Sequence, residues 1–185
     1  MFCAFELPPA LQTSISKHAK RVREAVPEAA ASWSRAENIH LTVKFFGNVD
    51  QAKAPVISAA AARVVKEFSP IQIEVGTTGV FPRPSRPQVL WIGIADPSGE
   101  LLKLQQRLEH EFAREGFPKE DRAFRPHLTI ARIRKPQNAD RLAQTHLGLE
   151  FSSVPVTLNE LILFRSELSS KGSKYTSISR HRLEH

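Results

Sequence analysis

Two short runs of almost identical sequence carry the residues of this chain that could do chemistry. Residues 39–43 read Ile-His-Leu-Thr-Val, and residues 126–130 read Pro-His-Leu-Thr-Ile. Each run places a histidine two residues before a threonine in an alternating apolar stretch, so in a β-strand both side chains point to the same face. Two such strands facing each other would bring two imidazoles and two hydroxyls into one cleft, a set suited to acid–base chemistry on a phosphate.

Histidine suits both proton-transfer roles, because an unperturbed pKa near ~6.5 makes its neutral and charged forms accessible at neutral pH. In phosphodiester hydrolysis one neutral imidazole would take a proton from attacking water, and one protonated imidazole would give a proton to the departing sugar oxygen. Each such group contributes ~10²–10⁴-fold to the rate. The hydroxyls of Thr42 and Thr129 would donate to the non-bridging phosphoryl oxygens. Because the triplet recurs, we interpret His40 and His127 as one shared site rather than two half-exposed strand residues.

Strict alternation assigns a face to each residue of the two strands. In the first strand the cleft face would hold His40, Thr42, Lys44 and Phe46. Phe45 would then lie on the core face. In the second strand alternation puts Arg132 on the core side, so this side chain would reach the cleft only past a β-bulge or from the strand end.

Other catalytic signatures are absent from the sequence. A zinc site would need a third histidine, cysteine or acidic residue at ligand spacing, and none stands near either run. There is no His-Glu-x-x-His run, no Gly-x-Ser-x-Gly elbow and no Gly-x-x-x-x-Gly-Lys phosphate loop. Four further histidines sit on polar helical or terminal stretches and are predicted to be solvated: His18, His110, His146 and His181. We expect neither a metal nor another cofactor.

The composition is that of a globular protein with a basic surface. A chain of 185 residues fits one domain or two small lobes sharing a core, and its net charge of +7 favours anionic partners such as nucleic acid. No apolar run approaches the ~20 residues of a membrane span. The N-terminal residues do not have the pattern of a signal peptide. The single Cys3, in an apolar run, indicates a buried thiol and a reducing cytoplasm. Residues 183–185 look like the remnant of an expression tag.

Hydrophobic periodicity predicts an alternation of strands and helices. Strands are predicted at residues 1–7, 39–46, 71–75, 89–94, 127–133, 154–164 and 174–179, with a loop or short strand at 29–36. Helices are predicted at residues 10–25, 52–68, 98–115 and 139–146. Three prolines within residues 81–87 predict a stiff loop. The order favours an α+β fold with two mainly antiparallel sheets facing across a cleft, and the 87-residue separation of the two runs indicates an internal duplication.

At these residues the chain resembles the 2H phosphoesterase superfamily, which is defined by two His-x-Thr/Ser motifs. It is most similar to the RNA 2′,3′-cyclic phosphodiesterase branch, also known as 2′-5′ RNA ligase. The resemblance is carried by residues 2–8, Trp33, 37–49, 81–82, 89–91, 124–132, 163–166 and 172–175. It implies one bilobal domain over residues 1–182, with pseudo-two-fold symmetry, helices outside and one His-x-Thr strand from each lobe.

The resemblance also implies an activity and its residues. A 2′,3′-cyclic phosphate would be hydrolysed to a 2′-phosphate without metal, and RNA ends could be joined through a 2′-5′ bond without ATP. His40 would be the proton donor and His127 the proton acceptor, although pseudo-symmetry allows the reverse. Thr42 and Thr129 would bind the phosphate.

Two further residues receive roles from their place in the motifs. Arg132 would add positive charge at the site. Phe46 would stack on a base, with packing at the cleft edge as the alternative. Lys44 is polar and on the predicted cleft face, but it is left out of the core set because family members vary there.

Other functions remain open at the level of sequence. The same motifs serve enzymes of the superfamily that act on 2′-5′ oligoadenylates, cyclic ADP-ribose phosphates or the 3′ ends of small RNAs. A different class is an RNA-binding module without catalysis, which the charge permits but which does not call for two matched His-Thr pairs. The expected partners are RNA or nucleotides with 2′,3′-cyclic phosphate ends, with no membrane and no obligate protein partner.

Overall fold

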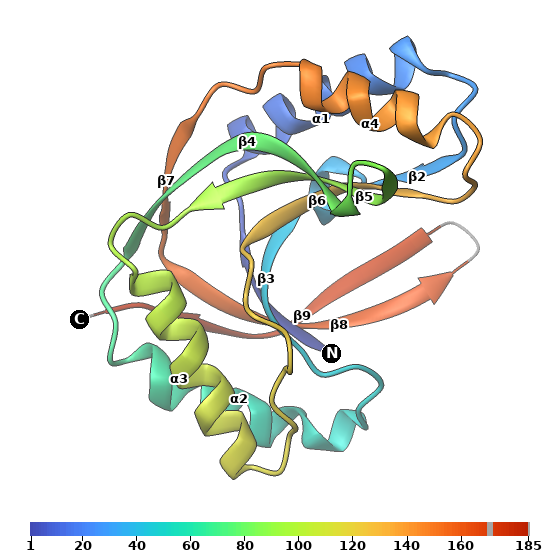
Figure 1. Cartoon of the computed structure of the whole chain (residues 1–185). Helices are drawn as coiled ribbons and strands as arrows, with labels where there is room; N and C mark the ends of the chain where they lie inside the picture. The colour runs from blue at the N-terminus through green and yellow to red at the C-terminus, as the bar shows by residue number, and fades with distance from the viewer. Residues whose placement is uncertain (170–171, 185) are drawn as a thin grey trace.

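The computed structural model describes residues 1–169 and 172–184, and it has the expected α+β architecture with two antiparallel sheets (Figure 1). Sheet A contains, in spatial order, β3 (His40–Phe45), β1 (Phe2–Glu6), β8 (Glu160–Ser169) and β9 (Gly172–Arg182). Sheet B contains β2 (Ala31–Trp33), β6 (His127–Ile133), β5 (Arg86–Ala95), β4 (Ile71–Arg83) and β7 (Val154–Leu158). β3 is an edge strand of sheet A and lies against β6 of sheet B, so the two His-Thr strands meet where the sheets adjoin.

Helices cover the outer sides of both sheets in pairs (Figure 1). The pair α1 (Pro9–Ala25) and α4 (Ala139–Gly148) packs on sheet B, and the pair α2 (Ala54–Val65) and α3 (Glu100–Arg114) packs on sheet A. Short 3₁₀ helices η1 (Ala36–Asn38) and η2 (Gln51–Lys53) flank β3. The apolar stripes of the helices and the inner sheet faces form one continuous core.

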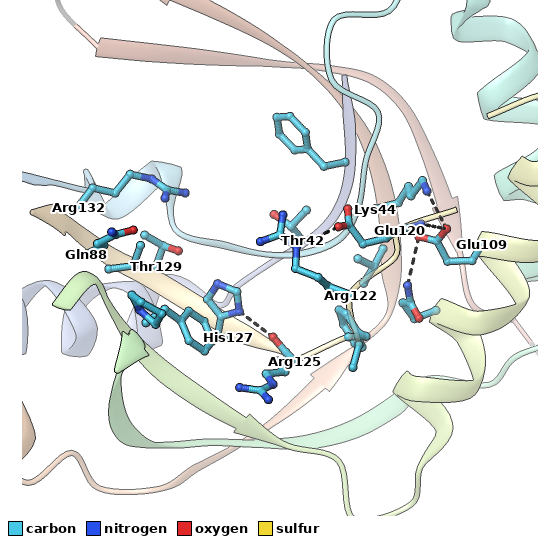
Figure 2. A pocket seen from close by; sticks show the side chains of 18 residues that line it. Thr42, Lys44, Gln88, Glu109, Glu120, Arg122, Arg125, His127, Thr129 and Arg132 are labelled. Carbon is cyan, nitrogen blue, oxygen red and sulfur yellow. Dashed lines mark hydrogen bonds and ion pairs between the residues drawn. The ribbon is translucent and has the colours of Figure 1, made fainter. Parts of the chain in front are cut away.

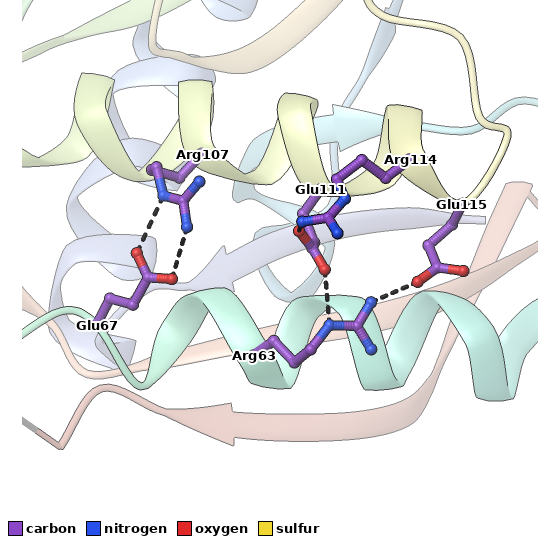
Figure 3. A network of polar contacts seen from close by, with 6 residues as sticks. All are labelled: Arg63, Glu67, Arg107, Glu111, Arg114 and Glu115. Atoms are coloured by element: carbon purple, nitrogen blue, oxygen red, sulfur yellow. Dashed lines mark hydrogen bonds and ion pairs between the residues drawn. The ribbon is translucent and has the colours of Figure 1, made fainter.

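Ion pairs on the surface join α2 to α3 (Figure 3). The guanidinium of Arg107 donates to both carboxylate oxygens of Glu67, at 3.0 and 2.6 Å. Arg63 donates to Glu111 at 2.6 Å and also contacts Glu115. Such exposed pairs contribute little free energy individually, so the apolar contacts beneath them hold the helix pair together.

Two predicted segments have a different structure. Residues 81–87 are not a loop, because β4 runs to Arg83 and β5 begins at Arg86. Pro82 lies opposite Pro87, and a non-hydrogen-bonded pair needs no N–H from either residue, so the ladder tolerates both prolines. The strand predicted at 154–164 is two strands, since the chain passes from sheet B to sheet A at Asn159.

The C-terminal residues set aside as a tag remnant also contribute to the fold. Leu183 is buried in the main core, and its backbone N–H donates to the carbonyl of Asn159 at 2.8 Å. His185 lies outside the described residues. Cys3 is buried as predicted, and burial raises the pKa of its thiol to about 12, which makes it an unreactive core side chain.

Two histidines predicted to be solvated are buried between the α1–α4 pair and sheet B. His18 is 3 % exposed and His146 is 0 % exposed. His146 Nε2 donates to the carbonyl oxygen of Trp91 at 3.0 Å, and the two imidazoles share a 3.0 Å bond between His18 Nε2 and His146 Nδ1. The signal was present in the sequence, because His18 lies three residues after Ile15 and four before Val22 on the apolar stripe of α1.

Candidate active site

A cleft of about 710 Å³ opens where β3 and β6 approach each other, which is enough space for a nucleotide. Thr42 of β3 lines one side, and His127 and Thr129 of β6 line the other (Figure 2). The guanidinium of Arg132 extends toward the same space. The cleft therefore brings together one imidazole, two hydroxyl groups and one guanidinium group from residues that are up to 90 positions apart in the sequence.

A β-bulge in β3 changes the predicted alternation of this strand. Against β1, Lys44 faces Cys3 and Thr42 faces Ala4, so Val43 is an extra residue without a partner. An extra residue reverses the inward and outward order of every side chain that follows it. Phe45 and Phe46 therefore lie on the opposite faces from those predicted.

The second strand has the same bulge at the corresponding position. Against β5, Ala131 faces Leu90 and Thr129 faces Trp91, which leaves Ile130 as the extra residue. The reversal turns Arg132 from the core side to the cleft. Its predicted route to the site, past a bulge, is the one that the structure takes.

The predicted faces of Phe45 and Phe46 were wrong, because strict alternation does not hold past Val43. Lys44 is nearly buried but is among the residues that line the cleft. Phe45 lines the cleft and is 61 % exposed. Phe46 packs edge-on against Phe112 and Phe117, with ring centroids 4.9 and 5.3 Å away, and is not among the residues that line the cleft. Of the two roles considered for Phe46, the structure shows packing.

The imidazole of His127 is held in one orientation. Its Nδ1 lies 2.7 Å from the carbonyl oxygen of Arg125, so the ring N–H donates there and the neutral ring keeps Nε2 free to accept a proton (Figure 2). Phe81 contacts the ring edge-on at 4.9 Å. Burial lowers the pKa of His127; the bond to Arg125 opposes this, and the charge of Arg132 lowers the pKa further.

His40 lies on the same face of β3 as Thr42 but deeper, and it is not among the residues that line the cleft. Its ring stacks on Phe2, with centroids 4.7 Å apart, and meets Tyr175 edge-on at 5.2 Å. Burial lowers the pKa of His40, while a hydrogen bond to the Asn38 carbonyl and the charge of Glu6 raise it. In both motifs the backbone of the residue two positions before the histidine raises the pKa of the histidine.

Imidazole, hydroxyl and guanidinium groups line the centre of the cleft, and Lys44, Glu109 and Glu120 line one end of it. Within residues 1–169 and 172–184 there is no group of three or more histidine, cysteine or acidic side chains placed to hold a metal ion. No helix in the same ranges has the length and apolarity to cross a membrane. Hydroxyl and guanidinium groups can bind an anion, and an imidazole can accept or donate a proton.

Comparison with known proteins places this arrangement in a family. The family model described as the 2′-5′ RNA ligase superfamily matches residues 11–169. The chain belongs to this superfamily. A protein of Methanothermobacter thermautotrophicus named RNA 2′,3′-cyclic phosphodiesterase is 33 % identical over 183 residues, covering 98 % of this chain and 97 % of that protein. One of the same name from Aquifex aeolicus is 31 % identical over 169 residues, covering 89 % of each.

The superfamily member shares its fold with solved structures. TT0787 of Thermus thermophilus superposes with a TM-score of 0.79 at 23 % identity, covering 98 % of this chain and 96 % of that one. LigT of Escherichia coli, solved with 3′-AMP, gives 0.74 at 24 % identity and covers 100 % and 97 %. The family assignment, the fold class and the assignment as a hydrolase of the cyclic phosphodiesterase type are confirmed.

Proposed function

We propose that this protein is an RNA 2′,3′-cyclic phosphodiesterase that hydrolyses 2′,3′-cyclic phosphate ends to 2′-phosphomonoesters. The names of the two relatives support the substrate class. The observation that carries the proposal is the repetition of one local structure on β3 and β6. Each strand has the same His-x-Thr face and the same bulge after the threonine.

Hydrolysis needs a base to activate water, and His127 is suited to this role. With Nδ1–H held by the Arg125 carbonyl, Nε2 accepts a proton from water as the water oxygen attacks phosphorus. The lowered pKa of His127 keeps this ring neutral at pH 7, and the nearby charge of Arg132 acts in the same direction. The P–O3′ bond then breaks and leaves the phosphate on O2′.

The departing O3′ must receive a proton, and His40 is the proposed donor. The charges around the two imidazoles differ: Glu6 stabilises a protonated His40, whereas Arg132 disfavours a protonated His127. This difference supports the assignment of His40 as acid and His127 as base, which the symmetric motifs alone leave open. An anionic phosphate bound beside His40 would raise its pKa further.

The remaining groups of the cleft would bind the substrate. The hydroxyls of Thr42 and Thr129 can donate to the non-bridging oxygens from opposite walls, and Arg132 adds a cation beside Thr129. The base-stacking role first considered for Phe46 passes to Phe45, whose ring is exposed at the cleft. Stacking of a base on an aromatic ring contributes about 1–3 kcal/mol.

Product analysis tests the proposal directly. The protein is incubated with 2′,3′-cyclic AMP, and the product is separated by chromatography against 2′-AMP and 3′-AMP standards and analysed by mass. We expect 2′-AMP alone, formed with the gain of one water. Formation of 3′-AMP would contradict the assigned bond cleavage, and absence of turnover on cyclic mononucleotides and on RNA with cyclic ends would contradict the function.

Histidine variants test the two-imidazole mechanism. His40→Ala and His127→Ala should each reduce kcat by about 10²–10⁴-fold while the protein stays folded. His110→Ala is the matched control, since His110 is exposed on α3. Turnover that survives either single replacement would exclude the mechanism. A non-catalytic RNA-binding protein would instead bind RNA equally well in all three variants.

Joining of RNA ends through a 2′-5′ bond is a second proposed activity of the same site, in which a ribose 5′-hydroxyl replaces water as the partner of the cyclic phosphate. It is tested with RNA fragments carrying a cyclic phosphate and a free 5′-hydroxyl, without ATP. A panel containing 2′-5′ oligoadenylate and a cyclic ADP-ribose phosphate decides whether another superfamily substrate is preferred.

A further inference from the structure

A buried ion pair lies at one end of the cleft, and the proposed reaction gives it no role. Lys44 of β3 is 5 % exposed and Glu109 of α3 is 9 % exposed. Lys44 Nζ donates to Glu109 Oε2 at 2.7 Å. Burying two charges costs desolvation free energy, and two well-packed apolar side chains are often at least as stable. The pair is therefore poorly explained by stability alone.

Both members of the pair also bind the backbone of the segment that precedes β6. Lys44 Nζ donates to the carbonyl oxygen of Pro118 at 2.7 Å. Glu109 Oε2 accepts the N–H of Glu120 at 3.1 Å, and Glu109 Oε1 accepts from Gln105 at 3.3 Å. Figure 2 shows Lys44, Glu109 and Glu120 clustered at this end of the cleft.

The segment held in this way leads to the proposed base. Phe117 at its start packs against Phe46, and at its end the carbonyl of Arg125 accepts Nδ1–H of His127 at 2.7 Å. Beyond the bulge at Val43, Lys44 lies at the end of the cleft with its Nζ on this segment, and Phe46 packs against the start of the segment. One strand thus supplies Thr42 to the site and holds the backbone that orients His127 on the other strand.

We propose that the Lys44–Glu109 pair, which joins β3 to α3, is a strap that positions residues 117–126 and, through the Arg125 carbonyl, the imidazole of His127. Lys44 and Glu109 are positioning residues in this proposal. It rests on the proposed role of His127 as base. Its consequence is that the two His-Thr strands depend on each other, since a residue of the first motif fixes the tautomer of the second histidine.

The test replaces both members of the Lys44–Glu109 ion pair, so that neither charge is left buried without its partner. In the double variant Lys44→Met and Glu109→Met the apolar side chains fill the space, but the Pro118 carbonyl and the Glu120 N–H lose their partners. We expect kcat for 2′,3′-cyclic AMP to fall about tenfold to a hundredfold with KM within about threefold. Lys44→Arg, which keeps a cation able to donate, should retain most of the activity.

The decisive readout is the tautomer of His127, which a purely structural role would leave unchanged. In ¹⁵N-labelled protein at pH 8 the imidazole nitrogen shifts report whether Nδ1 or Nε2 carries the proton. We expect the Nδ1–H form in the parent protein and a mixture in the double variant. Unchanged shifts and unchanged kcat in the folded double variant would overturn the proposal, as would a rise in KM alone, which would make Lys44 a substrate ligand.

A second pair of variants covers the case in which the double variant does not fold. Glu120→Pro removes the side chain and the N–H that Glu109 binds, and its ring restricts the backbone there, whereas Glu120→Ala removes the same side chain and keeps the N–H. We expect a tautomer mixture in Glu120→Pro and not in Glu120→Ala. Equal imidazole ¹⁵N spectra in Glu120→Pro and Glu120→Ala would overturn the proposed positioning role of the pair. Because the spectra need no substrate, they test the strap even if the protein does not hydrolyse cyclic phosphates.

Discussion

Val43 and Ile130 occupy the same place in the two halves of the molecule. Each is the extra residue of a β-bulge, and each directly follows a threonine of the site. The fifth residue after each histidine is thereby turned into the cleft, and here the halves differ: the first strand presents Phe45 and the second presents Arg132. At equivalent positions, one wall of the cleft thus carries an aromatic ring and the other carries a cation. The two walls therefore differ in chemistry.

The bulge in β3 leads to opposite predictions for two adjacent phenylalanines. Phe45→Ala should raise KM for a cyclic nucleotide by roughly tenfold, because a stacking surface is lost, and change the free energy of unfolding by less than about 0.5 kcal/mol. Phe46→Ala should leave KM nearly unchanged and lower the free energy of unfolding by about 2–4 kcal/mol through loss of packing. Urea denaturation and steady-state kinetics on both variants check this. A larger KM effect in Phe46→Ala would show that the assigned faces are reversed.

The pH–rate profile should be bell-shaped, with its optimum below pH 6.5. The proposed mechanism requires neutral His127 and protonated His40, and burial lowers the pKa of both. The acid limb, where His127 gains a proton, therefore moves to lower pH. The basic limb, where His40 loses its proton, also moves to lower pH. kcat/KM measured from pH 4 to 9 reports both limbs of the free enzyme, and a flat profile above pH 7 would contradict the role of His40 as acid.

Charge-removing variants assign the limbs to the two histidines. Glu6→Gln removes a charge that raises the pKa of His40, so the basic limb should move to lower pH. Arg132→Gln removes a charge that lowers the pKa of His127, so the acid limb should move to higher pH. Movement of the opposite limb in each variant would exchange the acid and base roles.

Removal of metal ions should leave turnover unchanged. The proposed proton transfers use imidazoles, and the proposed phosphate ligands are hydroxyls and a guanidinium, so no step requires a Lewis acid. The measurement is kcat after dialysis against EDTA and again after addition of Mg²⁺, Mn²⁺ or Zn²⁺ in separate samples. Loss of turnover with EDTA and its recovery with one metal would favour a metal-dependent mechanism.

Most of the fold and the centre of the candidate site could be predicted from the sequence, because both depend on local periodicity. The alternation of apolar residues located β3 and β6, and the repeated His-Leu-Thr triplet indicated which faces belong together. The faces of Phe45 and Phe46 could not be predicted, since the bulge at Val43 is set by pairing with β1 and the regular alternation of the sequence gives no sign of it.

The missed features share a physical cause, which is that they depend on partners distant in the sequence. The break at Asn159 follows from pairing of β7 with β4 and of β8 with β1. Lys44 is buried only because Glu109, 65 residues away, offers a carboxylate to it. His18 is buried because His146, 128 residues away, accepts its N–H.

The buried histidine pair predicts a loss of stability on the acid side of neutrality. Since His146 Nε2–H donates to Trp91, His146 Nδ1 accepts and His18 Nε2–H donates, so both rings are neutral in the fold. Burial, then the neighbouring His146, then Arg21 lower the pKa of His18 to about 4. The unfolded chain takes up this proton near ~6.5, so the stabilisation is complete above pH 6.5 and is lost as pH falls toward 4.

The expected size of this loss is about 2–3 kcal/mol in the free energy of unfolding, from the size of the pKa shift. Urea denaturation at pH values from 7 to 4.5 measures it. The double variant His18→Leu and His146→Leu is the control, because other groups titrate equally in both proteins. Its free energy of unfolding should decrease less steeply than that of the parent below pH 6.5. Parallel curves would mean that the buried pair accepts a proton without cost, contrary to the neutral arrangement inferred from its hydrogen bonds.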